Sequence, residues 1–222
     1  MSTTTYYAYA GHHCLDANRV INQASTDVKY PFSTDGTDYQ NPAFYDAAFV
    51  KKHCGKNPSK VKENGVYVDF TIKNSGCGIC SVAMFILNKT AVECNNANVF
   101  KAVELATKNA TNANALLWDS KTFTVELADK KATVHMEFIE SDLERAKESM
   151  RDGKKCIIRM RDDTYGGHYV LADGFNENAC DMLDWFLVCD SNGGKQRTLR
   201  DAVKACRGHS EETDTFTYRV IY

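Results

Sequence analysis

The order of helical and strand-like patterns along the chain constrains its fold more than any other feature. Residues 77–88 and 97–108 carry apolar side chains at helical spacing, and the first segment is apolar enough to be largely buried. A third helix is expected at 142–152, where Ser141 begins a capping box. Strand-like runs dominate the chain after residue 120, at 121–127, 132–138, 156–160, 168–175, 185–190 and 216–222. Helices that come early and strands that cluster late favour an α+β fold with an antiparallel sheet.

The chain is expected to form a single domain, 1–222, with an irregular stretch near its start. Its 222 residues suit one domain of the larger kind, and no internal repeat or low-complexity tract is present. All three prolines lie before residue 60, and residues 24–65 mix Pro, Gly, Asn and Lys. This composition predicts an insertion or loop region with one short helix near 42–52. A strand is expected directly after it, at 66–72.

Charge and hydropathy exclude several kinds of partner. The formal net charge is −2, which argues against nucleic acid or an anionic membrane. No run of about 18 apolar residues occurs, so no membrane span is expected. The N-terminus lacks the basic start and apolar stretch of a signal peptide, which suits a cytoplasmic protein or a secreted one whose leader has been removed. Nine cysteines, an odd number, fit a reducing compartment.

Cys77 has the setting of a reactive thiol. It opens the first buried helix and stands between Gly76 and Gly78. The N-terminus of a helix stabilises a thiolate, because unpaired N–H groups and the positive end of the helix dipole point at it. The two glycines would let a substrate backbone approach the sulfur closely. Cys77 is therefore the candidate nucleophile.

His168 is the candidate base for that nucleophile. It opens a strand directly after the flexible pair 166–167, and a thiol needs such a group to form a thiolate and to pass a proton to the leaving group. The next strand ends at Asp190, 22 residues later. Adjacent antiparallel strands set the start of one beside the end of the other, so the two side chains are expected to meet. Asp190 would orient the imidazole, with Asn192 as the alternative third member.

These motifs resemble the papain-like peptidases of the double-glycine-leader group, the bacteriocin-processing peptidases and their stand-alone relatives. Those proteins carry Gly-Cys-Gly-Pro-Thr/Ser at a helix start, Gly-His-aromatic-Val-Leu at a strand start, and an Asp-Pro-like element after the following strand. The matching segments here are Gly76-Cys77-Gly78, Gly167-His168-Tyr169-Val170-Leu171 and Asp190, and the resemblance covers residues 66–192. It implies a papain-like cysteine peptidase core, in which the helix bearing the nucleophile packs on an antiparallel sheet.

The resemblance also implies an oxyanion hole that includes a glutamine upstream of the cysteine, often in an Asn-Gln pair. Asn22-Gln23 is similar to that pair, and Gln23 lies 54 residues before Cys77. The intervening stretch would then be an insertion. Asn74 and Gln40 are the alternative donors for an oxyanion.

The implied reaction is acyl transfer. A cysteine peptidase would hydrolyse peptide bonds through a thioester on Cys77, with His168 as general base and acid. A peptide or protein is the expected substrate, and the peptides of the bacterial cell wall, cleaved by a bacterial or phage enzyme, are a special case that rests on association alone. The alternatives are a thioester-forming transferase of the transglutaminase-like kind and a non-catalytic binding domain on a peptidase core.

Cys77 and Cys80 also form a Cys-x-x-Cys motif, where the family has Pro-Thr/Ser at positions 79 and 80. Thioredoxins carry such a motif before a helix, but they need a cis-proline downstream, and no proline follows Pro58. That fold is therefore excluded, while a thiol–disulfide switch that protects the nucleophile stays open. Neither a second Cys-x-x-Cys, nor a His-x₃₋₅-His, nor a phosphate-binding loop is present, so no metal or cofactor is expected. The run His12-His13-Cys14 is interpreted as a polar N-terminal segment.

Overall fold

A computed structural model of the protein describes residues 9–24, 72, 76–112, 115–116, 120–162, 166–206 and 208–222. The expected insertion at 24–65 lies outside this part of the chain except for Ala24, as does the short helix expected at 42–52. The strand expected at 66–72 also lies outside it except for Ile72. Ile72 is helical, and its carbonyl oxygen accepts a hydrogen bond from the Gly76 N–H at 2.8 Å. The expected strand therefore does not extend to Ile72.

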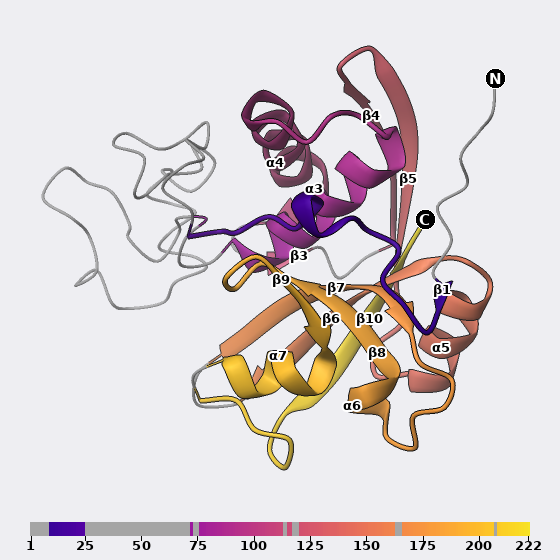
Figure 1. Ribbon diagram of the computed structural model, residues 1–222. Helices are drawn as coiled ribbons and strands as arrows, with labels where there is room; N and C mark the ends of the chain where they lie inside the picture. Colours follow the sequence, from indigo (N-terminus) through magenta and orange to yellow (C-terminus); the bar gives the residue numbers. More distant parts are fainter. Residues whose placement is uncertain are drawn as a thin grey trace, which may run out of the picture.

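One large sheet forms the centre of the molecule (Figure 1). Its strands follow the order β4-β5-β10-β6-β7-β8-β9, and all neighbours along this path are antiparallel. The short β1 pairs with the end of β7 in parallel. The strands are β1 (Tyr9–Ala10), β4 (Lys121–Leu127), β5 (Lys130–Phe138), β6 (Lys155–Asp162), β7 (Gly166–Phe175), β8 (Phe186–Asp190), β9 (Lys195–Thr198) and β10 (Thr215–Ile221). A separate pair joins β2 (Thr111–Asn112) to β3 (Ala115–Leu116).

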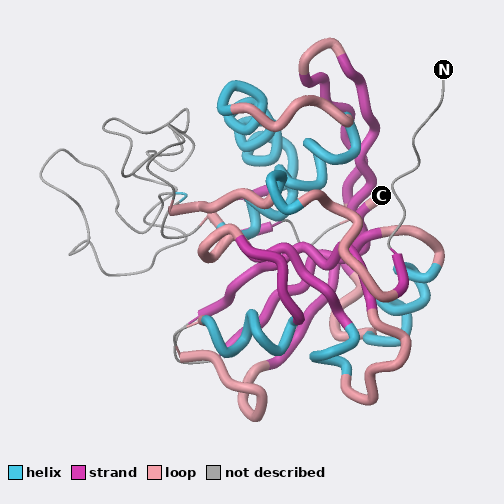
Figure 2. The backbone as a smooth tube through the Cα atoms, in the orientation of Figure 1, coloured by secondary structure: helices cyan, strands magenta, loops and turns pink. Residues whose placement is uncertain are grey.

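Helices cover both faces of the sheet (Figure 2). On one face lie α3 (Cys77–Thr90) and α4 (Asn96–Ala110), which pack on each other and on β4, β5 and β7. On the other lie α5 (Leu143–Arg151), α6 (Met182–Trp185) and α7 (Leu199–Ala205). Side chains alternate between the faces along each strand, so Ile157 joins the first core cluster while Ile158 joins the second. None of the helices among the described residues is long and apolar enough to cross a membrane.

The α+β class with an antiparallel sheet is confirmed, with local differences from the sequence prediction. Helix α5 is capped by Asp142, whose Oδ1 accepts from the Arg145 N–H at 3.0 Å, and not by Ser141. Trp185 ends α6 and does not begin β8. Strand β9 was not predicted, because its sequence is polar and charged and it lies at the edge of the sheet, where no apolar alternation is required.

Candidate active site

Helix α3 carries Cys77 as its first residue and is buried along almost its whole length. Of its fourteen residues, only Lys89 is not buried. Gly76 is the N-cap, and a Cβ at this position would lie 2.4 Å from Cγ2 and 2.5 Å from the carbonyl oxygen of Ile72, so only glycine fits. The N-cap residue itself, being glycine, offers no side chain to cap the helix. The first turn of a helix has N–H groups without acceptors in the helix, and that of Gly78 helps to lower the pKa of Cys77.

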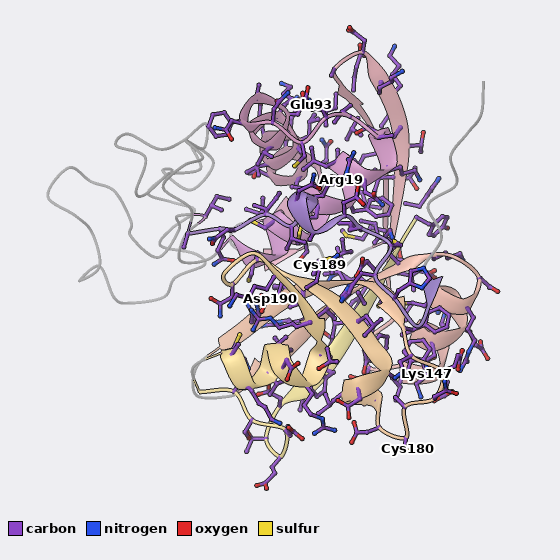
Figure 3. All side chains as sticks on the ribbon, viewed as in Figure 1. Arg19, Glu93, Lys147, Cys180, Cys189 and Asp190 are labelled. Carbon is purple, nitrogen blue, oxygen red and sulfur yellow. The ribbon has the colours of Figure 1, made fainter. Side chains whose placement is uncertain are left out.

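The structure brings His168, near the start of β7, together with Asp190, the last residue of β8, which Figure 3 labels. Strands β7 and β8 pair so that Leu171 lies opposite Cys189. His168 shares a face of β7 with Val170, and Asp190 shares the corresponding face of β8 with residues of the second core cluster. Nε2 of His168 lies 2.7 Å from Oδ1 of Asp190.

Asp190, and not Asn192, is the residue that contacts the imidazole. Asp190 is fully buried, and its Oδ1 also accepts from the Asn192 N–H at 2.8 Å. The second carboxylate oxygen lies 3.5 Å from Nε of Arg197 on β9. The Asn192 side chain instead donates to the carbonyl of Ala205 at 3.4 Å. The carboxylate is therefore held from several sides, and this fixes the orientation of the imidazole.

The thiol of Cys77 and the imidazole of His168 stabilise each other's charged forms. Burial alone would raise the pKa of Cys77, but the hydrogen bond and charge of His168, with two backbone N–H groups, outweigh it and lower the pKa. Burial alone would lower the pKa of His168, but its hydrogen bond to Asp190 opposes this. Hydrogen bonds with the thiols of Cys206 and Cys77 also help to raise the pKa of His168 well above its usual range. Both shifts favour a thiolate beside an imidazolium.

Gln23 contacts Ser191, the residue after Asp190. The Ser191 hydroxyl donates to Oε1 of Gln23 at 2.7 Å, and the Gln23 N–H donates to the Ser191 carbonyl at 3.1 Å. Asn22 packs so closely on the following turn that a Cβ at Gly194 would lie 2.9 Å from the Asn22 Cβ. The chain thus brings Gln23 to the same end of the sheet as His168. The alternative donors Asn74 and Gln40 lie outside the described residues.

Sequence reasoning missed two groups that surround the site. Cys206 follows α7 and lies within hydrogen-bonding reach of the His168 imidazole. Arg197 approaches Asp190 from the edge strand β9. Neither residue belongs to a motif or stands at a diagnostic spacing from Cys77, so no signal in a single sequence marks them.

A second buried polar cluster corrects the interpretation of His12-His13-Cys14 as a merely polar segment. Fully buried Asp173 on β7 accepts from the Cys14 and Leu15 N–H groups at 3.0 and 2.9 Å. Its other oxygen lies 2.7 Å from Nδ1 of His13. The ammonium group of Lys155, itself buried, contacts the Cys14 sulfur. These contacts tie the N-terminal segment that carries Gln23 to the sheet.

Among the described residues, one group of side chains could hold a metal ion, and it lies within this second cluster. Ligand atoms of His13, Asp173 and Cys189 lie within 4.8 Å of one another. Asp173 already accepts hydrogen bonds on both oxygens, and the buried Lys155 supplies a positive charge nearby. The cluster is therefore satisfied as a structural anchor without a cation.

The first site combines a thiol at a helix N-terminus, an imidazole and a buried carboxylate, with Gln23 held at the same end of the sheet through Ser191. This set suits nucleophilic attack on an acyl carbon, since it offers a nucleophile, a base with its orienting group, and donors for an oxyanion. Comparisons with models of protein families, with curated proteins and with solved structures find no match to the chain.

Proposed function

We propose that this protein is a cysteine peptidase with a papain-like core that hydrolyses peptide bonds through a thioester on Cys77. The observation that carries the proposal is the position of His168, whose Nε2 lies 2.7 Å from Oδ1 of Asp190 and whose imidazole lowers the pKa of the Cys77 thiol beside it. A histidine held between a thiol and a buried carboxylate has the geometry of a general base whose tautomer is fixed. A histidine with only a packing role would not explain why the pKa of the neighbouring thiol is lowered.

The geometry supports a two-stage reaction. The Cys77 thiolate attacks the carbonyl carbon of a peptide bond, and negative charge develops on the carbonyl oxygen. The Cys77 N–H and the carboxamide of Gln23 would stabilise that oxygen. The His168 imidazolium gives its proton to the departing amine, and the neutral imidazole then takes a proton from the water that hydrolyses the thioester.

Asp190 acts through His168 and not on the substrate. Its Oδ1 accepts from the imidazole at 2.7 Å, which leaves the other ring nitrogen to face the thiol. The negative carboxylate also stabilises the imidazolium that exists before acylation. The substrate is a peptide or protein, and cell-wall peptides are the special case to be screened first among bacterial substrates.

Peptide hydrolysis is the direct test of the proposal. We expect a mixed peptide library to yield new amine termini with the wild-type protein. None should appear with Cys77→Ala, because the substitution removes the sulfur that attacks the peptide bond. Cys94→Ala, which alters a half-buried thiol elsewhere, should cleave like the wild type. Mass spectrometry of the products provides the measurement. Products joined to an added primary amine would point to the transferase, and an unchanged library would remove the peptidase proposal.

Gln23→Ala should separate the stabilisation of the oxyanion from the activation of the thiol. We expect peptide turnover to fall about 10²–10³-fold, the usual effect of losing one oxyanion donor. Alkylation of Cys77 by iodoacetamide should be unchanged, because that reaction forms no oxyanion. Parallel measurement of the two rates checks this expectation. Equal losses in both rates would show that Gln23 supports the thiolate instead.

A further inference from the structure

Cys80 is a second thiol beside the nucleophile, and the proposed hydrolysis gives it no role. It lies on α3 three residues after Cys77, so both side chains share one face of the helix. Cys80 has no exposed surface, whereas Cys77 is 7% exposed. Burial and then the charge of Cys77 raise the pKa of Cys80 well above its usual range. Cys77 is thus the more exposed of the two residues, while Cys80 is shielded from solvent and has Cys77 as its near partner.

The start of the helix is a favourable place for these two sulfurs to join. Residues three apart in an α-helix have Cα atoms about 5 Å apart, within the roughly 4.4–6.8 Å that disulfides span. Cys77 is the first residue of α3, so its own N–H has no acceptor within the helix. Its backbone can therefore adjust without breaking a helical hydrogen bond at that N–H.

We propose that Cys77 and Cys80 form a reversible disulfide when a hydroperoxide oxidises the nucleophile. The Cys77 thiolate attacks the peroxide oxygen, the O–O bond breaks, and the departing oxygen takes a proton, which leaves a sulfenic acid on Cys77. The Cys80 sulfur then attacks the Cys77 sulfur, and the hydroxyl group leaves as water with the Cys80 proton. A thiol reductant reverses the bond. The inference rests on the same reactive Cys77 as the proposed function, but not on hydrolysis.

Cys206 is the competing thiol, and the structure favours Cys80 over it. Cys206 lies at the end of α7 in the second core cluster and contacts the imidazole of His168. Cys80 is on the same helix as Cys77, in the first core cluster. A bond to Cys206 would have to join two layers of the molecule, whereas a bond to Cys80 needs only a local adjustment of one helical turn.

Peptide mapping after peroxide treatment tests the proposal on the whole protein. Trypsin releases residues 74–89, which hold both Cys77 and Cys80, and residues 205–207, which hold Cys206. After hydrogen peroxide and a block of remaining thiols, we expect peptide 74–89 to lose two hydrogens and to regain them with dithiothreitol. Peptide 74–89 joined to 205–207 would overturn the proposal, and so would a sulfinic or sulfonic acid on Cys77 beside a free Cys80.

Cys80→Ala supplies the matched variant, since a buried cysteine behaves as a small apolar side chain and alanine fits its place. We expect its Cys77 to pass to the sulfinic and sulfonic acids and to lose iodoacetamide labelling irreversibly, while Cys94→Ala recovers full labelling like the wild type. Equal recovery in Cys80→Ala would overturn the proposal. Labelling of untreated protein separates the two claims. A reactive Cys77 that forms no disulfide leaves the peptidase proposal standing, whereas an unreactive Cys77 ends both.

Discussion

Replacement of His168 by alanine should lower the rate at which iodoacetamide alkylates Cys77 by about 100-fold near pH 6. The thiolate is the reacting species, and an ordinary thiol is only about 0.3% ionised at that pH. In the wild type the imidazolium and the helix N-terminus lower the pKa of Cys77, so a larger share of the thiol is ionised than in an ordinary cysteine. In His168→Ala, the imidazolium no longer offsets burial, the largest influence on the thiol, so the pKa of Cys77 rises. A short pulse of reagent followed by mass spectrometry measures the rate.

The pH profile of the wild type should show the sign of these shifts. Alkylation should persist as the pH falls below the ordinary range for a thiol, and decline only when it falls through the lowered pKa of Cys77. His135→Ala, which alters a histidine on β5 outside the site, should keep this profile. A wild-type profile that follows an ordinary thiol pKa would show that no thiolate–imidazolium pair forms.

Removal of the Asp173 carboxylate should destabilise the protein by about 3 to 5 kcal/mol. In Asp173→Ala, the N–H groups of Cys14 and Leu15 and the His13 imidazole lose their acceptor, and each such loss costs roughly 1–3 kcal/mol. For a domain of this size the melting temperature should fall by about 10 °C. Thermal unfolding measures the shift, and hydrogen exchange should show faster exchange at the amides of Cys14 and Leu15.

Asp16→Ala is the control in the same segment. The Asp16 side chain is 80% exposed and forms only a surface ion pair with Arg19, so its loss should change stability by less than about 1 kcal/mol. Asp173→Asn keeps an acceptor oxygen and should lie between the two. Equal melting temperatures for Asp16→Ala and Asp173→Ala would show that the buried carboxylate does not anchor the segment.

Local patterns were sufficient to predict most helices and strands and the meeting of His168 with Asp190. That meeting needs only two adjacent antiparallel strands, because the start of one and the end of the next lie side by side whatever the rest of the fold does. The buried helix that begins at Cys77 could be predicted in the same way, because its apolar spacing and its glycine N-cap lie in one short stretch of sequence.

Contacts between distant parts of the chain could not be predicted in the same way. Asp173 and the N-terminal residues it binds are about 160 positions apart, and no sequence pattern in either segment predicts that the two segments meet. Cys206 meets His168 only because α7 folds back on β8. The helix cap was missed for a different reason, since Ser141 and Asp142 are both good capping residues and their order alone does not decide between them.

Cys77 belongs to the core cluster beneath α3 and α4, while the strand faces that present His168 and Asp190 belong to the opposite cluster. The thiol and the imidazole are therefore held by elements packed on opposite faces of one sheet. A change of side-chain volume beneath α3 can shift this helix against the sheet by a fraction of an ångström without unfolding the protein. Such a shift would change the distance between the Cys77 sulfur and the His168 imidazole, so the proposed reaction would be affected before the fold is.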